Sequence, residues 1–335
     1  MRFRIAAVVA LVVLAAGGAV CAWLFIPFGS GGADFPEPVA IEIERGTSTR
    51  SIAEELEAKG VIPSKWRFLA IRALRRSDTL MAGYYRFARP MTDWEAFEAL
   101  REGSVRYYPV TIPEGFNRFE IADAVAATGL MSKQEFVAAT EDVRGVKEQF
   151  PEARNLEGLL FPDTYYLDET STPAKIIAAM LEQFRIAFAD TTRQASPDLK
   201  PYELLILASM IEKETPESEE HDVVSSVFHN RLRIGMPMQC DPTVVYGLVV
   251  EDRYRGRLLS VDLEDPHPYN TYMHGGLPPG PIANPGRKAL RAAAQPAETE
   301  FLYFVAKGDG AGHVFSKNLG DHNRAVAAYR RSLGR

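Results

Sequence analysis

The sequence predicts an α+β protein with a single transmembrane helix at its N-terminus. Three observations support this prediction: an uncharged apolar run at positions 5–28, strand-like alternation of apolar and polar residues near both ends of the remaining chain, and helical patterns between them. The composition, 46% hydrophobic and 24% charged, is that of a folded protein. A net charge of −6 gives no basic footprint for a nucleic-acid partner.

The apolar run is long enough to cross a bilayer, since a helix rises about 1.5 Å per residue and the hydrocarbon core is about 30 Å thick. Two arginines precede it, and no Lys or Arg follows it before Arg45. The positive-inside rule therefore predicts a cytoplasmic tail at 1–4, an anchor at 5–28 and an exported remainder. A cleaved signal peptide and a lipid on Cys21 are the alternatives, although neither a clear A-x-A site nor a small residue before Cys21 is present.

Residues 29–38 are rich in Gly and Pro and form a linker, after which a first folded domain spans 39–108. This domain starts with the alternating strand pattern of 39–44 and continues with a helical pattern that ends near Gly60. The pattern returns without a gap at 109–155, which predicts a second strand–helix–turn–helix unit. Short βα units of this kind resemble LysM carbohydrate-binding modules, more clearly in the first copy. The aligned positions are Gly46, Ile52, Ala53, Leu56 and Gly60 with Gly115, Ile121, Ala122, Val125 and Gly129.

The third and largest domain spans 156–335 and combines helices with a C-terminal pair of strands. We expect an amphipathic helix from Pro173 to about Ala189 and a more apolar helix from Glu203 to Glu214. Pro216 ends the second helix, and Thr215 is expected to cap a new helix at that proline. At the C-terminus we expect strands at 301–307 and 313–316, joined by a Gly-rich turn, and a closing helix from about Asn323 to Leu333.

Glu214 is the candidate catalytic residue because it lies in the last turn of the most apolar helix. Leu207, Met210 and Ile211 share its side of that helix. An apolar surround and the negative end of the helix dipole both disfavour the carboxylate, so both raise its pKa, as a glycosidic general acid requires. Glu212 has a somewhat more polar neighbourhood and is the alternative acid, and a third interpretation places both glutamates at the surface.

The segments that follow this helix are rich in aromatic and amide side chains and poor in charge, as in clefts that bind sugars. They are 238–247, 269–272 and 275–286. Alternatively, their tyrosines and prolines only pack the connections. The histidines and the two cysteines show no metal-ligand spacing, so we expect neither a metal nor a cofactor.

Six motifs of the chain closely resemble those of the endolytic murein transglycosylase family, in the same order. They are Ala208–Thr215, Ser226–Leu232, Asp241–Thr243, Tyr269–Tyr272, Gly276–Ile282 and a C-terminal block at 301–323. The resemblance implies a lytic transglycosylase of the inner membrane, with a cytoplasmic N-terminus and a periplasmic catalytic domain. It also implies peptidoglycan as the substrate, and penicillin-binding proteins or other peptidoglycan synthases as partners.

In that family the second glutamate of the Glu-Lys-Glu-Thr motif is catalytic, which corresponds to Glu214. It would protonate the oxygen of the MurNAc–GlcNAc β-1,4 bond and then take the proton of the MurNAc C6 hydroxyl, so that a 1,6-anhydro end terminates the nascent strand. Two further acids, Glu220 and Asp241, would have positioning or electrostatic roles. The residues expected to bind substrate are Glu220, Asn230, Gln239, Asp241, Thr243, Tyr246, Tyr269, Asn270, Thr271, Tyr272, Leu277 and Pro278.

Cys240 departs from the family pattern, because a small polar residue such as Thr or Ser is expected before Asp241. A thiol is a weak hydrogen-bonding group, so we expect no direct role for this side chain. Two other functions stay open. One is a non-catalytic, membrane-anchored adapter that binds peptidoglycan, and the other is a muramidase that hydrolyses glycan with two carboxylates.

Overall fold

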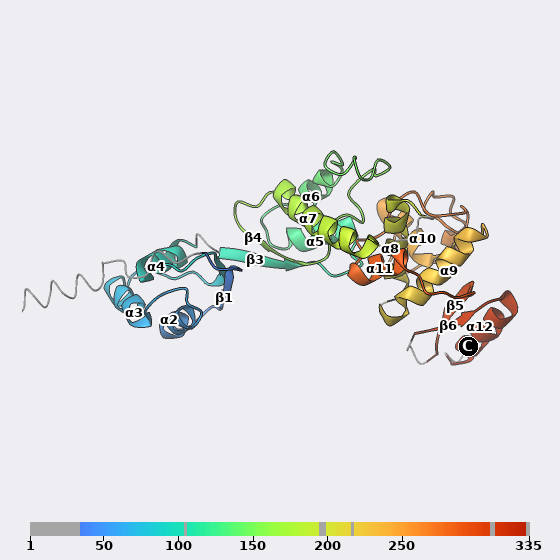
Figure 1. Ribbon diagram of the computed structural model, residues 1–335. Helices are drawn as coiled ribbons and strands as arrows, with labels where there is room; N and C mark the ends of the chain where they lie inside the picture. The colour runs from blue at the N-terminus through green and yellow to red at the C-terminus, as the bar shows by residue number, and fades with distance from the viewer. Residues whose placement is uncertain (1–33, 104–105, 194–198, 216–217, 309–311, 333–335) are drawn as a thin grey trace, which may run out of the picture. The chain divides into compact units, whose positions relative to one another are not determined.

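The computed structural model describes residues 34–103, 106–193, 199–215, 218–308 and 312–332, and the chain divides into two compact units (Figure 1). The first unit runs to Pro109 and includes Tyr166–Glu169, and the rest of the chain forms the second. The predicted tail, anchor and first part of the linker lie outside the described residues. None of the described helices is long and apolar enough to cross a membrane. The α+β prediction is confirmed, because α-helices accompany small antiparallel sheets in the described chain.

The first unit buries one core between its strands and helices. The strands β1 and β2 pair antiparallel, with Ile41 opposite Tyr85, and both side chains are buried because they point to the same face. The strand order is β1-β2-β3-β4, and β3 and β4 also have residues in the second unit. The elements are β1 (Val39–Ile43), α2 (Thr49–Ala58), α3 (Lys65–Leu74), β2 (Gly83–Phe87), α4 (Asp93–Glu102), β3 (Arg106–Thr111) and β4 (Thr164–Leu167).

The helix pair α2 and α3 recurs in the second unit as α5 (Arg118–Ala126) and α6 (Lys133–Ala139). Gly46 before α2 and Gly115 before α5 have φ values of +90° and +78°, a left-handed conformation that favours glycine. The glycines that follow the first helix of each pair, Gly60 and Gly129, have φ values of +71° and +75°. The positions aligned from the sequence are buried in both copies, namely Ile52, Ala53, Leu56, Ile121, Ala122 and Val125.

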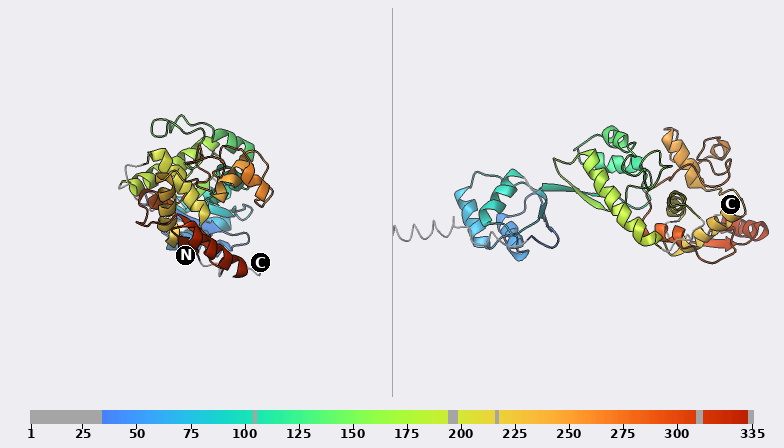
Figure 2. Two further views of the ribbon diagram at one scale, coloured as in Figure 1. Left: turned by 90° about the vertical axis from the view of Figure 1, so that its right-hand side faces the viewer. Right: turned by 45° about the horizontal axis from the view of Figure 1, so that its top comes forward.

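The second unit is built around α8 (Pro201–Glu214), whose residues from Leu204 to Ile211 are all buried. The helix that the sequence predicts to be the more apolar one is therefore buried on all its sides over this stretch. Helices α9 (His221–Arg233), α10 (Asp241–Val250) and α11 (Arg287–Ala294) pack against it. Figure 2 shows α7 (Pro173–Thr192), coloured yellow-green, as the long helix of this unit.

The connection after α8 differs from the prediction. Thr215 stays extended, with φ −143° and ψ 126°, and a 3-10 turn at Ser218–Glu220 precedes α9. Because α9 begins only at His221, the prediction of a helix capped by Thr215 was wrong. The His221 Nε2 atom lies 3.1 Å from the Thr215 carbonyl oxygen, and this bond ties the start of α9 to the end of α8.

The C-terminal segment forms the predicted hairpin and closing helix. Strands β5 (Tyr303–Ala306) and β6 (His313–Ser316) pair antiparallel, and α12 (Leu319–Ser332) packs on them (Figure 1). The helix starts before the predicted Asn323, because the Asn318 side chain accepts a hydrogen bond from the Asp321 backbone N–H at 3.0 Å and so holds the first turn.

Candidate active site

The carboxyl group of Glu214 lies at the C-terminal end of the buried helix α8. Burial, helped by the nearby Asp241 carboxylate, raises its pKa to about 7, although the Cys240 thiol and the Arg231 guanidinium act in the opposite direction. The side chain itself is half-buried, so the group combines an apolar surround with an opening to solvent. A carboxyl group with a pKa of about 7 is substantially protonated at neutral pH and can donate that proton.

Glu212, the alternative acid, accepts a hydrogen bond from the protein backbone. Its Oε2 atom accepts a hydrogen bond from the Gly286 backbone N–H at 2.9 Å. Burial and the nearby Glu114 carboxylate raise its pKa, and the bond from Gly286 lowers it. Glu212 therefore holds the start of α11 against the end of α8, and the structure separates the two glutamates more clearly than helical spacing did.

Cys240 and Asp241 approach Glu214 from the start of α10. The Cys240 side chain is fully buried, and its thiol donates a hydrogen bond to the Glu214 carboxylate. This contact was not expected from the sequence, where we assigned the thiol no direct role. The exposed Asp241 carboxylate accepts a hydrogen bond from the Tyr272 hydroxyl at 2.6 Å, so two predicted site residues do meet.

Arg231 is a buried cation that the sequence analysis did not single out as a site residue. Its guanidinium donates to the carbonyl oxygens of Leu302 at 2.7 Å and Met238 at 2.6 Å. The group also packs over the Tyr303 ring at 5.3 Å from the centroid. Arg231 thereby joins α9 to the loop before Cys240, and its charge favours the ionised form of Glu214.

Glu157 is a second buried charged residue that we did not predict from the sequence as part of the site. Its side chain is only 1% exposed. Its carboxylate accepts hydrogen bonds from the Arg118 backbone N–H at 3.1 Å, the Tyr246 hydroxyl at 2.9 Å and the Asn284 amide at 2.9 Å. A further bond comes from the Gly158 backbone. Burial raises its pKa to about 7 against these donors. A glutamate inside the apolar run that ends at Phe161 was the available signal.

Asn284, which bonds Glu157 from the proline-rich loop at 275–286, has a fixed amide orientation. The Asn284 Oδ1 atom accepts from the Leu160 backbone N–H at 2.8 Å, and its Nδ2 donates to the Phe116 carbonyl at 2.9 Å. The amide can therefore only donate to Glu157. This network joins the start of α5 and the middle of α10 to the loop before α11, and so positions the walls of the site.

A pocket of about 510 Å³ runs along α10 from the neighbourhood of Glu214. Lys213 and Asp241 line one end, and Tyr254 and Leu258 line the other, with Tyr246 between them. The opposite wall comes from α5 and the turn before it, including Asn117, Phe119, Glu120 and Asp123. Of the predicted site residues, Asp241 and Tyr246 line this pocket.

Several other predicted site residues use their polar atoms inside the protein. Asn270 donates to three carbonyl groups of the 262–265 segment, the shortest bond being 2.7 Å to Asp265. Thr243 and Thr271 bond each other at 2.9 Å, and Asn230 bonds the carbonyls of Thr299 and Phe301. These four side chains shape the loops around the site, because their hydrogen-bonding groups are occupied.

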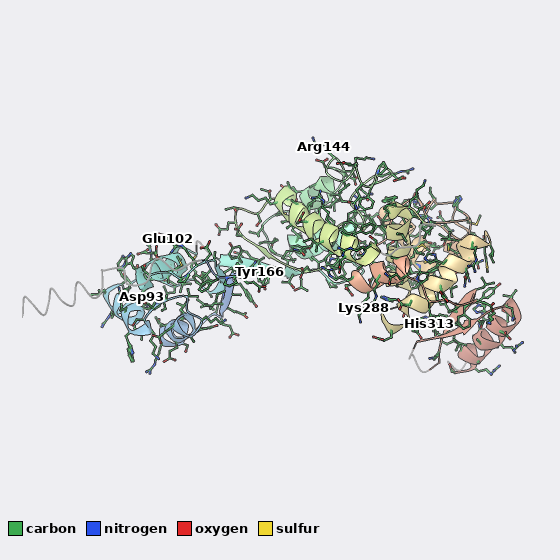
Figure 3. The ribbon with its side chains drawn as sticks, in the orientation of Figure 1. Asp93, Glu102, Arg144, Tyr166, Lys288 and His313 are labelled. Carbon is green, nitrogen blue, oxygen red and sulfur yellow. The ribbon has the colours of Figure 1, made fainter. Side chains whose placement is uncertain are left out.

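The remaining predicted residues lie in different settings. The Glu220 carboxylate bonds the backbone N–H of His313 at 2.9 Å and its ring Nδ1 at 2.6 Å, which fastens β6 to the turn before α9. Figure 3 labels His313. Tyr269 packs on Tyr246, with ring centroids 4.9 Å apart. Gln239 is exposed with φ +48°, while Leu277 is half-buried and Pro278 is buried. Among the described residues no group of His, Cys, Asp and Glu is arranged to hold a metal ion.

Comparisons with known proteins place this chain among related sequences. The model of the YceG-like family matches residues 41–328. A Bacillus subtilis (strain 168) protein named endolytic murein transglycosylase is 35% identical over 314 residues, which cover 88% of this chain and 86% of that protein. A protein of the same name from Streptococcus pneumoniae serotype 2 (strain D39) is 28% identical over 322 residues, which cover 87% of this chain and 58% of that protein. The crystal structure of a putative yceG-like protein from Listeria monocytogenes is 31% identical with a TM-score of 0.57, and the match covers 86% of this chain and 99% of that one.

Proposed function

This chain belongs to the YceG-like family, and from that premise we propose that it is an endolytic murein transglycosylase with Glu214 as its acid and base. The observation that carries the proposal is the raised pKa of Glu214 beside a pocket of about 510 Å³ that is lined by its neighbour Lys213 and by Asp241. The name of the Bacillus subtilis relative, which matches most of this chain, agrees with it.

In the proposed reaction the protonated Glu214 donates its proton to the glycosidic oxygen between MurNAc and GlcNAc. The bond between that oxygen and MurNAc C1 breaks, and GlcNAc leaves with a free hydroxyl. The Glu214 carboxylate then accepts the proton of the MurNAc C6 hydroxyl, whose oxygen bonds C1. The products are a 1,6-anhydroMurNAc end and a regenerated acid, without consumption of water.

A one-carboxylate mechanism suits the neighbourhood of Glu214. A hydrolase would need a second carboxylate free to hold a water molecule or to attack the sugar. Glu157 is buried and saturated with donors, and Glu212 is engaged by a backbone N–H. Asp241 is close enough to raise the pKa of Glu214 and lines the pocket, so a two-carboxylate muramidase that uses Asp241 is the second candidate.

We further propose that the apolar run at 5–28 anchors the chain in the inner membrane, with residues 1–4 cytoplasmic and the rest periplasmic. The asymmetry of Lys and Arg about this run supports the orientation. Such an anchor would keep the enzyme near newly made strands and near the synthases that make them. The 39–108 segment is proposed to bind peptidoglycan in a LysM-like manner.

The test is product analysis with the full-length protein in detergent and purified peptidoglycan. Wild type and Glu212→Gln should both release muropeptides lighter by one water than hydrolytic products, because Gln at 212 can still accept the Gly286 bond. Glu214→Gln should release none. Hydrolytic products from wild type that vanish in Asp241→Asn would favour the muramidase, and equal activity in Glu214→Gln would remove Glu214 from the reaction.

A further inference from the structure

The loop after α10 separates two pockets. On one side Tyr254 and Leu258 close the far end of the pocket along α10. On the other side Arg253, Arg255 and Arg257 line a second pocket of about 450 Å³. Gly256, with φ +79°, provides the left-handed turn between the last two arginines. One short loop therefore forms a wall of the proposed glycan site and presents cations on its other face.

Two of these guanidinium groups have no partner within the described chain. Arg253 is neutralised by Glu251 at 2.6 Å and by Asp265 at 2.5 Å. Arg255 and Arg257 are exposed, and neither has an ion pair or a hydrogen bond to another described residue. Exposed arginines are often only solvated, but these two converge on one cavity.

The same pocket also contains carboxylates. Asp262 is partly satisfied by the Leu259 backbone N–H at 2.8 Å, and Glu264 is exposed. The lining of the pocket thus combines two unpaired cations with acidic groups. A ligand that carries both carboxylates and an amine would match this pattern better than a purely anionic ligand.

We propose that this arginine pocket binds the peptide that MurNAc carries in murein, with Arg255 and Arg257 on its carboxylates. That peptide branches from the glycan and bears several carboxylates and the free amine of a diamino acid. A glycan in the pocket along α10 would send such a branch across the loop at Tyr254. Guanidinium groups bind carboxylates in a planar, two-point geometry, which suits recognition at an exposed site.

This inference rests on the proposed function, because it assigns a subsite for the same substrate. It predicts that peptide-bearing strands are better substrates than strands from which an amidase has removed the peptides. Arg255→Gln with Arg257→Gln should raise KM for peptide-bearing strands by about three- to tenfold and leave denuded strands unaffected, as expected for two exposed ion pairs. The matched control is Arg330→Gln with Arg331→Gln, two exposed α12 arginines with the same change in charge.

A binding experiment separates this inference from the catalytic proposal. The free tripeptide L-Ala-D-Glu-diaminopimelate is titrated into wild type and into both double variants by NMR. Binding lost only in the Arg255/Arg257 variant supports the subsite even if no anhydro product is ever detected. No binding to wild type, an equal KM for both kinds of strand, or the same loss in the control variant would overturn it.

Discussion

Replacement of Glu214 by Gln should stabilise the protein at alkaline pH while it abolishes activity. A carboxyl group whose pKa is raised in the folded state holds its proton more tightly there than in the unfolded chain. Between the unfolded value of 4.5 and the folded value of about 7, the folded state therefore binds more protons, and its stability falls as the pH rises. Gln carries no titrating proton, so the variant escapes this loss.

The magnitude follows from the pKa. A rise from 4.5 to about 7 corresponds to about 3 kcal/mol, at about 1.4 kcal/mol per pKa unit. Because the Glu214 side chain is only half-buried, solvent screening reduces this figure, and we expect a gain of about 1–3 kcal/mol above pH 8. Below pH 4 the gain should disappear, because the carboxyl group is then protonated in both states. The raised pKa of Glu157 affects wild type and variant equally and cancels.

The assay is urea unfolding at pH 4 and pH 8, followed by far-UV circular dichroism and by tryptophan fluorescence. All three tryptophans, Trp23, Trp66 and Trp94, precede the second unit, so fluorescence follows the first unit only. The urea midpoint of the fluorescence transition should therefore be the same in wild type and variant if the two units unfold independently. A gain of equal size at both pH values, or none at pH 8, would refute the assignment of a desolvated carboxyl group to position 214.

Two further changes test the network around this group. Cys240→Ala removes a donor that lowers the pKa of Glu214, so the alkaline limb of the pH–activity profile should shift to higher pH, by a few tenths of a unit to about one unit. Cys240→Ser introduces a stronger donor and should shift the same limb to lower pH. Steady-state rates between pH 5 and 9 measure this, and shifts of the same sign in both variants would contradict it. Tyr246→Phe leaves the buried Glu157 without its hydroxyl donor and should cost about 1–3 kcal/mol of stability at pH 8, while Tyr254→Phe, at an exposed ring, should cost almost nothing in the same denaturation assay.

Local patterns in the sequence predicted the elements that carry the site. The run from Leu204 to Ala208 and the proline at 216 defined α8 and placed Glu214 in its last turn, because burial and backbone geometry leave a trace in neighbouring residues. The repeated glycines predicted two helix pairs for the same reason. The start of α9 was not predicted correctly, because it depends on the bond from His221 to the Thr215 carbonyl rather than on a local cap.

The partners of the site could not be predicted, because they are distant in sequence. Glu157 accepts hydrogen bonds from three residues that lie 39, 89 and 127 positions away in the sequence. The residues next to Glu157 do not indicate which donors these are. Amide and hydroxyl side chains are equally ambiguous. Asn270 and Thr271 looked like ligands for a sugar, yet Asn270 bonds the backbone of its own loop and Thr271 bonds the Cys240 N–H at the start of α10, because buried polar groups must find partners inside the protein.

Three glutamates of the described second unit have raised pKa values, and their hydrogen bonds distinguish their roles. Glu157 and Glu212 accept bonds from backbone N–H groups that cannot move, so protonation of either would weaken contacts that hold the walls together. Glu214 accepts only from a thiol among the described residues, and a thiol is a weak donor. Its carboxyl group can therefore gain and lose a proton at little structural cost. Burial raises the pKa of all three, but the weak partner of Glu214 is what leaves its proton free to be transferred.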